Sequence, residues 1–249
     1  MLRFNFKEFF CRAARYTLHV FLPRVCFSCG CDLRWDSTAF LCPSCQAGLT
    51  LPGPLICKRC GVTLKSGGAH CYHCRGSKSR QYQCAVIRSA CNFNQFSRGL
   101  IHALKYQGID YVAPYMGGLM AQCFSKFDEL QGVNLVIPVP LFKKRKNKRG
   151  YNQSELLARV LARQLGLKLD TTSLIRVRDT VSQTKLGRQE RISNMQDAFK
   201  VKQTADVRGK NVLLVDDVAT TGATLEGCAR ALRKAGAKRV VAYTFSREN

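Results

Sequence analysis

From residue 84 onwards, short apolar runs alternate with amphipathic stretches. Four runs have the length and composition of buried strands: 85–93, 135–139, 212–215 and 240–245. Four stretches have helical periodicity, and three of them are followed by Gly108, Gly166 or Gly236: 96–106, 112–127, 152–165 and 224–235. Strands that alternate with helices predict an α/β fold, in which a parallel sheet is flanked by helices.

The first part of the chain lacks this alternation and divides in two. Apolar residues recur at helical spacing over residues 1–22, which predicts a basic amphipathic helix that packs on the next domain or lies on a membrane surface. Residues 23–78 are rich in cysteine and poor in periodic apolar positions, and 75–83 has the composition of a linker. We therefore predict a helix over 1–22, a cysteine module over 23–78 and the α/β domain over 79–249.

The cysteine module carries a doubled metal-binding pattern. The chain has 14 cysteines, and eight of them form four C-x-x-C pairs: Cys26, Cys29, Cys42 and Cys45, then Cys57, Cys60, Cys71 and Cys74. Two facing turns of this kind supply a tetrahedral sulfur shell, which predicts two structural Zn²⁺ ions in a small zinc-ribbon module. His70 and His73 lie beside ligands as substitutes, and an interleaved pairing of the cysteines stays open.

The remaining cysteines are expected to pack as small apolar side chains. They are Cys11, Cys31, Cys84, Cys91, Cys123 and Cys228. Arg12 and Arg15 interrupt the N-terminal apolar run, so no secretory signal is expected, and its uncharged stretch is too short to span a bilayer. Thiolates available for zinc indicate a reducing, cytoplasmic setting, with peripheral contact at the inner membrane as an alternative for the first helix.

The charge is lopsided, with 40 Lys and Arg against 16 Asp and Glu and a formal net charge of +24. Such a field favours polyanions: nucleic acid, nucleotide phosphates or anionic lipid. Solubility alone is the plainer explanation for the same excess.

The segment 212–225, VLLVDDVATTGATL, is the most informative candidate for a ligand-binding site in the chain. An apolar strand ends in Asp216 and Asp217, a bend rich in threonine follows, and a helix begins. Backbone amides at a helix start and the threonine hydroxyls make a cradle for a phosphate. The acids repel phosphate, so they suit the vicinal hydroxyls of a ribose attached to it. Helix capping is the alternative, although a cap needs only one acid.

This segment resembles the phosphoribosyl-diphosphate signature of type I phosphoribosyltransferases. The resemblance implies that Asp216 and Asp217 contact the ribose hydroxyls. It also implies that the bend binds the 5′-phosphate through Val218, Ala219, Thr220, Thr221, Gly222, Ala223 and Thr224. The expected fold is then the type I phosphoribosyltransferase fold, with Mg²⁺ accompanying phosphoribosyl diphosphate.

A wider resemblance covers nearly the whole chain. The doubled zinc pattern, the PVP turn at 138–140, KRGYNQSELLA at 148–158 and RVRDTVSQTKLGRQERISN at 176–194 resemble the ComF family, which includes GntX-like relatives and is associated with DNA uptake in competent bacteria. The resemblance implies that residues 176–191 form a mobile hood over the active site. The diphosphate site that it implies consists of Pro138, Val139, Pro140, Arg145, Arg149, Lys185 and Arg188.

Single-stranded DNA is a further expected partner, together with other DNA-uptake proteins. Single-stranded DNA binds in basic grooves that contain interleaved aromatic residues. The candidates here are Lys143, Lys144, Lys146, Lys148 and Tyr151. A solvated basic face, and for Tyr151 a place in the core, are the alternatives.

Three functions fit these patterns. The first is a ComF-like competence protein that binds phosphoribosyl diphosphate and handles single-stranded transforming DNA. The second is a salvage enzyme that transfers ribose 5-phosphate to a nucleobase, and the third is a non-catalytic binding module with the same fold. The ribose interpretation requires that the bend after Asp217 border a cleft, and that the two acids not be buried against lysine or arginine.

Overall fold

The computed structural model describes residues 17, 21, 23–75, 82–178, 197–202 and 206–248. Apart from Thr17 and Phe21, the helix predicted over 1–22 lies outside the described residues, as do Lys185 and Arg188. Among the described residues, no helix combines the length and the apolar composition that a membrane crossing needs.

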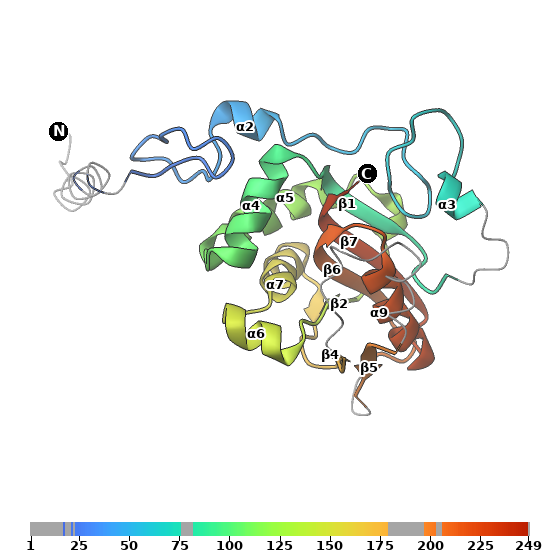
Figure 1. Ribbon diagram of the computed structural model, residues 1–249. Coiled ribbons are helices and arrows are strands. Elements are labelled where there is room, and N and C mark those ends of the chain that lie inside the picture. The colour runs from blue at the N-terminus through green and yellow to red at the C-terminus, as the bar shows by residue number, and fades with distance from the viewer. Residues whose placement is uncertain are drawn as a thin grey trace, which may run out of the picture.

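A five-stranded parallel sheet with the order β1-β7-β6-β2-β3 forms the centre of the α/β domain (Figure 1). Its strands are β1 (Ile87–Asn92), β2 (Leu135–Pro138), β3 (Lys168–Leu169), β6 (Asn211–Ala219) and β7 (Arg239–Arg247). The predicted strands are all present, but β6 is longer than predicted, because its pairing with β7 continues as far as Ala219 and Arg247. The two acids therefore belong to the strand itself.

Helices cover both faces of the sheet (Figure 1). Alternate residues of β6 point to opposite faces, so Leu213 and Val215 share a core with α4, α5 and α7, whereas Val212 and Leu214 share one with α9. These helices are α4 (Gln95–Tyr106), α5 (Ala113–Phe124), α7 (Gln153–Leu165) and α9 (Ala223–Lys234). The predicted parallel sheet between helices is the observed architecture.

Several smaller elements were not predicted. An antiparallel hairpin of β4 (Leu174–Arg176) and β5 (Phe199–Val201) stands apart from the sheet, and two 3-10 turns, η1 (Asp110–Val112) and η2 (Asp128–Leu130), flank α5. The run KKRKNKR forms α6 (Lys143–Arg149), which ends at Gly150 with a φ of 87°. No residue of α6 is buried, so its sequence carries no apolar period.

The two cysteine segments are built on the same turn. The amide of Cys26 donates to the carbonyl of Cys31 at 2.8 Å, and that of Cys57 donates to Val62 at the same distance. A short helix follows in each segment, α2 (Pro43–Ala47) and α3 (Tyr72–Arg75). This backbone agreement confirms the doubling that the cysteine spacing predicts.

The first cysteine segment docks on α4. Gly99 has no room for a Cβ atom, because that atom would lie 2.2 Å from the carbonyl oxygen of Phe27. At the start of the helix, the side-chain amide of Asn94 donates to the carbonyl of Gly48 at 2.8 Å. Cys45 and Leu41 of this segment belong to the hydrophobic core that α4 shares with the sheet.

The second cysteine segment is joined to strand β1 through Arg88. This guanidinium is almost fully buried and donates to the carbonyls of Ile87 at 2.8 Å and Lys58 at 2.9 Å, and it pairs with the half-exposed carboxylate of Glu129. One strand residue therefore holds the zinc segment and the turn after α5 together.

We expect Arg88→Met to weaken this junction. The substitution leaves two carbonyls without their donor, which costs about 1–3 kcal/mol, or a fall in Tm of about 2–4 °C per kcal/mol for a chain of this size. Thermal unfolding of the zinc-loaded protein measures the change. Arg239→Met is the matched control, because this less buried arginine also donates to carbonyls, those of Gln131 and Glu129. If both variants lowered Tm equally, Arg88 would have no special role at this junction.

Candidate functional site

Asp216 and Asp217 lie near the carboxyl end of β6, and both are buried. The hydroxyl of Ser154 donates to Asp216 Oδ1 at 2.6 Å, and the backbone amide of Asp217 donates to the same oxygen at 2.9 Å. Asp217 Oδ2 lies 2.5 Å from Lys105 Nζ of α4. The two carboxylates therefore have different partners, a hydroxyl for one and an ammonium for the other.

Their surroundings separate the two pKa values. Burial, together with the charge of Asp217, raises the pKa of Asp216 to about 7, although the Ser154 hydrogen bond acts in the opposite direction. Burial also opposes ionisation of Asp217, but Lys105 outweighs it and holds the pKa of Asp217 below its ordinary value. The ion pair likewise keeps the pKa of Lys105 raised despite its burial. Asp217 is thus the ionised member, and Asp216 changes between its protonated and ionised forms near neutral pH.

A cleft of about 490 Å³ opens beside the acids. It lies where β2 and β6 end and is walled by α4 and α6. Ligands of open parallel sheets bind at this edge, beyond the carboxyl ends of the strands. The walls include both acids, Thr220 of the bend, Thr224 in the first turn of α9, and Val139 and Pro140 of the turn after β2.

The bend places its backbone close to the cleft. Gly222 has a φ of 78°, a left-handed conformation that favours glycine, and stands at the N-cap of α9. No side chain caps this helix through the N-cap residue, and the amide of Ala223 donates to the Thr221 hydroxyl oxygen at 3.3 Å. Val218 and Ala219 belong to β6, so the bend proper is Thr220–Gly222. The helix start can therefore offer amides to an anion.

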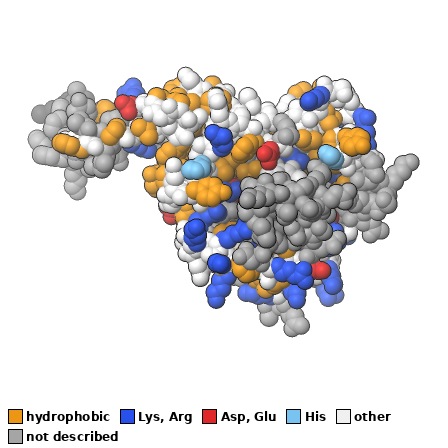
Figure 2. Space-filling model, viewed as in Figure 1, with side chains coloured by type: hydrophobic (Ala, Val, Ile, Leu, Met, Phe, Trp, Pro, Cys, Tyr) orange, Lys and Arg blue, Asp and Glu red, His pale blue; other side chains and the backbone are white. Residues whose placement is uncertain are grey.

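The basic run of α6 is divided between cleft and solvent. Arg145 and Arg149, one helical turn apart, line the cleft. A side-chain network joins Arg149 to Gln153, which in turn bonds to Asp217. The lysines of α6 are exposed: Lys143, Lys144, Lys146 and Lys148. Figure 2 shows Lys and Arg side chains gathered over this part of the surface, with few acidic ones.

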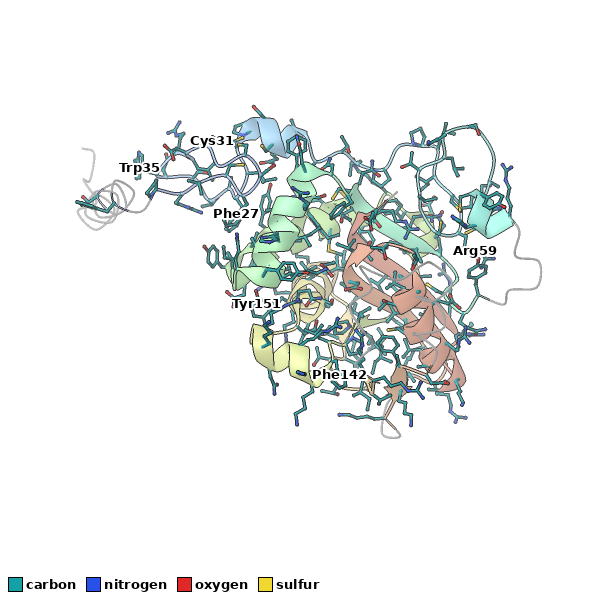
Figure 3. All side chains as sticks on the ribbon, viewed as in Figure 1. Phe27, Cys31, Trp35, Arg59, Phe142 and Tyr151 are labelled. Carbon is teal, nitrogen blue, oxygen red and sulfur yellow. The ribbon has the colours of Figure 1, made fainter. Side chains whose placement is uncertain are left out.

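Tyr151 is engaged inside the protein. Its hydroxyl donates to the carbonyl of Leu104 at 2.6 Å, and its ring packs against the core beside α4 (Figure 3). This contact joins the start of α7 to α4. Of the candidates for nucleic-acid contact, Tyr151 is therefore the least accessible.

Lys105 and Ser154 were not among the residues predicted for this site. Lys105 belongs to α4 and Ser154 to the first turn of α7, both far along the chain from β6. The bend does border a cleft, as the ribose interpretation requires. However, Asp217 is buried against a lysine, the arrangement that counts against it as a free ribose ligand. Asp216 instead accepts from the Ser154 hydroxyl and the Asp217 amide.

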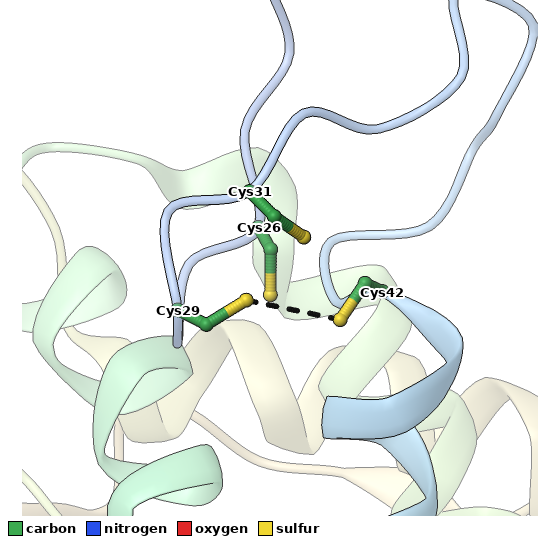
Figure 4. A group of neighbouring side chains, drawn as sticks. All are labelled: Cys26, Cys29, Cys31 and Cys42. Atoms are coloured by element: carbon green, nitrogen blue, oxygen red, sulfur yellow. Dashed lines mark hydrogen bonds between the residues drawn. The ribbon is translucent and has the colours of Figure 1, made fainter.

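Seven of the eight predicted zinc ligands fall into two clusters, and in the first cluster Cys31 stands where Cys45 was predicted. The sulfurs of Cys57, Cys60, Cys71 and Cys74 lie within 4.8 Å of one another, as do those of Cys26, Cys29, Cys31 and Cys42 (Figure 4). The expectation of apolar packing was wrong for Cys31, which is exposed and faces the thiols. Cys45 is buried beside Cys42, and neither His70 nor His73 belongs to a cluster of the described residues.

Both clusters fit zinc. A tetrahedral ion with Zn–S bonds of about 2.3 Å holds its sulfurs about 3.8 Å apart. The Cys29 and Cys42 sulfurs are 3.8 Å apart, and those of Cys60 and Cys71 are 3.7 Å apart. Four thiolates leave no open coordination position, so the ions are structural and their binding contributes to folding.

Comparisons with known proteins agree with both halves of the chain. The double zinc ribbon domain matches residues 17–75, and the phosphoribosyl transferase domain matches residues 152–249. Competence protein ComFC of Bacillus subtilis is 30% identical over 87% of this chain and 90% of its own. The chain belongs to the ComF family. Competence protein F of Haemophilus influenzae is 28% identical over 98% of this chain and 99% of its own. DNA utilization protein YhgH of Salmonella typhimurium is 29% identical over 91% and 98%.

The phosphoribosyl transferase domain match covers the acids but not the whole cleft. The phosphoribosyl transferase match includes β6, the bend and Ser154, whereas Lys105 and α6 lie before it. The fold of this ComF protein is thus the type I phosphoribosyltransferase fold with two structural zinc sites, and α4 and α6 complete the cleft around the matched segment.

We expect Asp216→Asn to stabilise the ligand-free protein above neutral pH. The folded pKa of Asp216 lies at about 7, above the unfolded value near 4, so its stabilising contribution is present at low pH and lost as the pH rises between these values. Asparagine can accept the same two hydrogen bonds without a charge. Its Tm should exceed that of the wild type at pH 8, by about 2–4 °C per kcal/mol of relieved repulsion, with the gap closing towards pH 4.

Asp217→Asn is the matched control for this measurement. It removes the partner of the largely buried Lys105 and should lower Tm at both pH values. A lower Tm for Asp216→Asn at pH 8 would show that its carboxylate is stabilised rather than strained.

Proposed function

We propose that the cleft binds phosphoribosyl diphosphate together with Mg²⁺, and that the protein acts in the handling of single-stranded DNA as a ComF-like competence protein. The single observation that carries the first half is the convergence of four groups on one cleft. They are the acid pair, the threonine bend, the turn after β2 and two arginines of α6. Sugar hydroxyls, a phosphate and a diphosphate are the chemistry these groups match.

Each part of the ligand has a partner. Carboxylates accept hydrogen bonds from ribose hydroxyls, and the amides at the start of α9 donate hydrogen bonds to the oxygens of the 5′-phosphate. The diphosphate then lies against the 138–140 turn with Arg145 and Arg149, which form bidentate contacts with phosphate oxygens. Lys185 and Arg188 remain candidates to close over it.

The Lys105–Asp217 pair limits how the acids can act. While it is closed, Asp217 has one oxygen occupied by an ammonium, so Asp216 is the acid better placed for a ribose hydroxyl. Oxygen donors also suit Mg²⁺, which keeps most of its ligands from water and substrate phosphate. The acid pair fits a Mg²⁺ ion that is bound together with the diphosphate. When bound, the ion would offset the negative charge of the phosphates.

The DNA part of the proposal rests on charge and on the family. The exposed lysines of α6 stand on the outer side of the helix whose arginines line the cleft. Relatives bear the names competence protein and DNA utilization protein. Thiolate zinc sites require a reducing setting, so we place this activity in the cytoplasm.

Calorimetry tests the ligand. We expect phosphoribosyl diphosphate with Mg²⁺ to bind the zinc-loaded full chain. At pH 8, above the pKa of about 7 of Asp216, Asp216→Asn should weaken binding by about tenfold or more, the value of a hydrogen bond to a charged group. Asp206→Asn is the matched control, since this acid lies 66% exposed away from the cleft. Absence of binding heat in the wild type would mean that the cleft is vestigial, and steady turnover with one nucleobase would favour a salvage enzyme.

Fluorescence anisotropy with a single-stranded oligonucleotide tests the DNA role. Each lost phosphate contact lowers the slope of log Kd against log salt by about 0.7 for single strands. We therefore expect Lys144→Gln/Lys148→Gln to reduce the slope by about 1 to 1.5. The matched control is Lys234→Gln/Lys238→Gln, an exposed pair at the opposite edge of the sheet, where α9 ends and β7 begins. Equal effects of the two pairs would remove α6 from the proposal.

A further inference from the structure

The first zinc site is surrounded by five cysteines, one more than a tetrahedral ion takes. Four sulfurs form the mutual cluster of Cys26, Cys29, Cys31 and Cys42. The fifth thiol, Cys45, also makes side-chain contacts with Cys42, Cys29 and Cys26. Cys31 approaches the cluster through Cys29 and Cys42. Both Cys31 and Cys45 are therefore within reach of the position that a fourth ligand must occupy.

The second site shows what is unusual about the first. In the turn of the first site, the amide of Cys26 bonds to the carbonyl of Cys31, and in the second the amide of Cys57 bonds to Val62. Val62 thus occupies the position of Cys31, and the second cluster of the described residues has four thiols. The doubled pattern assigns Cys45 as the counterpart of Cys74, whereas the geometry favours Cys31.

We propose that Cys31 and Cys45 alternate as the fourth ligand of the first zinc ion, so that this site has a spare thiol and the second site has none. In an exchange, the incoming thiol loses a proton and binds as thiolate, and the departing thiolate takes up a proton. The charge of the zinc site is unchanged. The Cys26, Cys29 and Cys42 sulfurs hold the ion throughout.

Burial makes both resting states acceptable. When Cys31 binds, Cys45 remains as a neutral thiol, 4% exposed, in the hydrophobic core with Leu41. A buried neutral cysteine behaves as a small apolar side chain there. When Cys45 binds, Cys31 stands in solvent, where a free thiol is hydrated. Neither state buries an unpaired charge, so the two differ little on this account.

The consequence is a zinc site that tolerates the loss of one thiol. Modification of the exposed Cys31 leaves four ligands, because Cys45 can complete the shell. Within the part of the chain that the structure describes, the second site lacks this reserve, and its Cys57 and Cys60 are buried instead. The protein therefore protects one structural ion by burial and the other by redundancy.

Zinc content and thiol labelling test the proposal on the full chain. Cys31→Ala and Cys45→Ser should each retain two zinc ions per chain, with chelator-competition affinity at the first site within about tenfold of the wild type. The double variant should lose at least about a hundredfold at that site, because a three-thiolate shell lacks a bond. Cys74→Ala, in the site without a spare thiol, should lose zinc as a single change.

Alkylation by N-ethylmaleimide, followed by mass spectrometry, gives a second readout. In the zinc-loaded wild type, Cys31 should be labelled without loss of zinc, and in Cys45→Ser its labelling should slow by at least about tenfold, because zinc then holds it. Cys45→Ser preserves the size of the buried side chain, and retained zinc would show that it folds. Loss of zinc in Cys31→Ala, or equally fast labelling of Cys31 in Cys45→Ser, would overturn the proposal.

Discussion

Two carboxylates buried side by side at the end of a central strand impose the main constraint on this structure. Ionised acids cannot remain together in a low-dielectric interior without compensation. Lys105 supplies a cation for Asp217, and the Ser154 hydroxyl supplies a donor for Asp216. Helices α4 and α7 must therefore lie close to β6, and with α6 they form the walls of the cleft.

The same constraint gives the site its chemical asymmetry. One acid is held ionised by a neighbouring charge, while burial favours the protonated form of the other. Such separation of pKa values within a cleft is typical of binding and catalytic sites. Burying two neighbouring carboxylates costs stability, and costs of this kind are concentrated at functional sites. Because Lys105 is paired with Asp217, the positive charge that the proposed diphosphate ligand needs comes from the arginines of α6.

The zinc segments are part of the same architecture rather than an appendage. Arg88 joins the second segment to β1, and Ile87 of the same strand approaches Gly222 of the bend, since a Cβ atom on that glycine would lie 3.0 Å from Ile87 Cδ1. The first segment contributes Leu41 and Cys45 to the core around α4. Each zinc ion thus stabilises a segment that packs against an element of the cleft.

The sequence by itself determined the parallel sheet, its flanking helices, the doubled zinc pattern and the position of the acid pair at the end of a strand. These features are local, since hydrophobic periodicity and ligand spacing depend on residues that are close together in the sequence. Only the tertiary structure decided that Lys105 pairs with Asp217, that α6 is a helix divided between cleft and solvent, and that Cys31 faces the thiols. The physical reason is that partners distant along the chain meet only after packing, and a run of like charges or a surplus cysteine carries no local signal of what it will face.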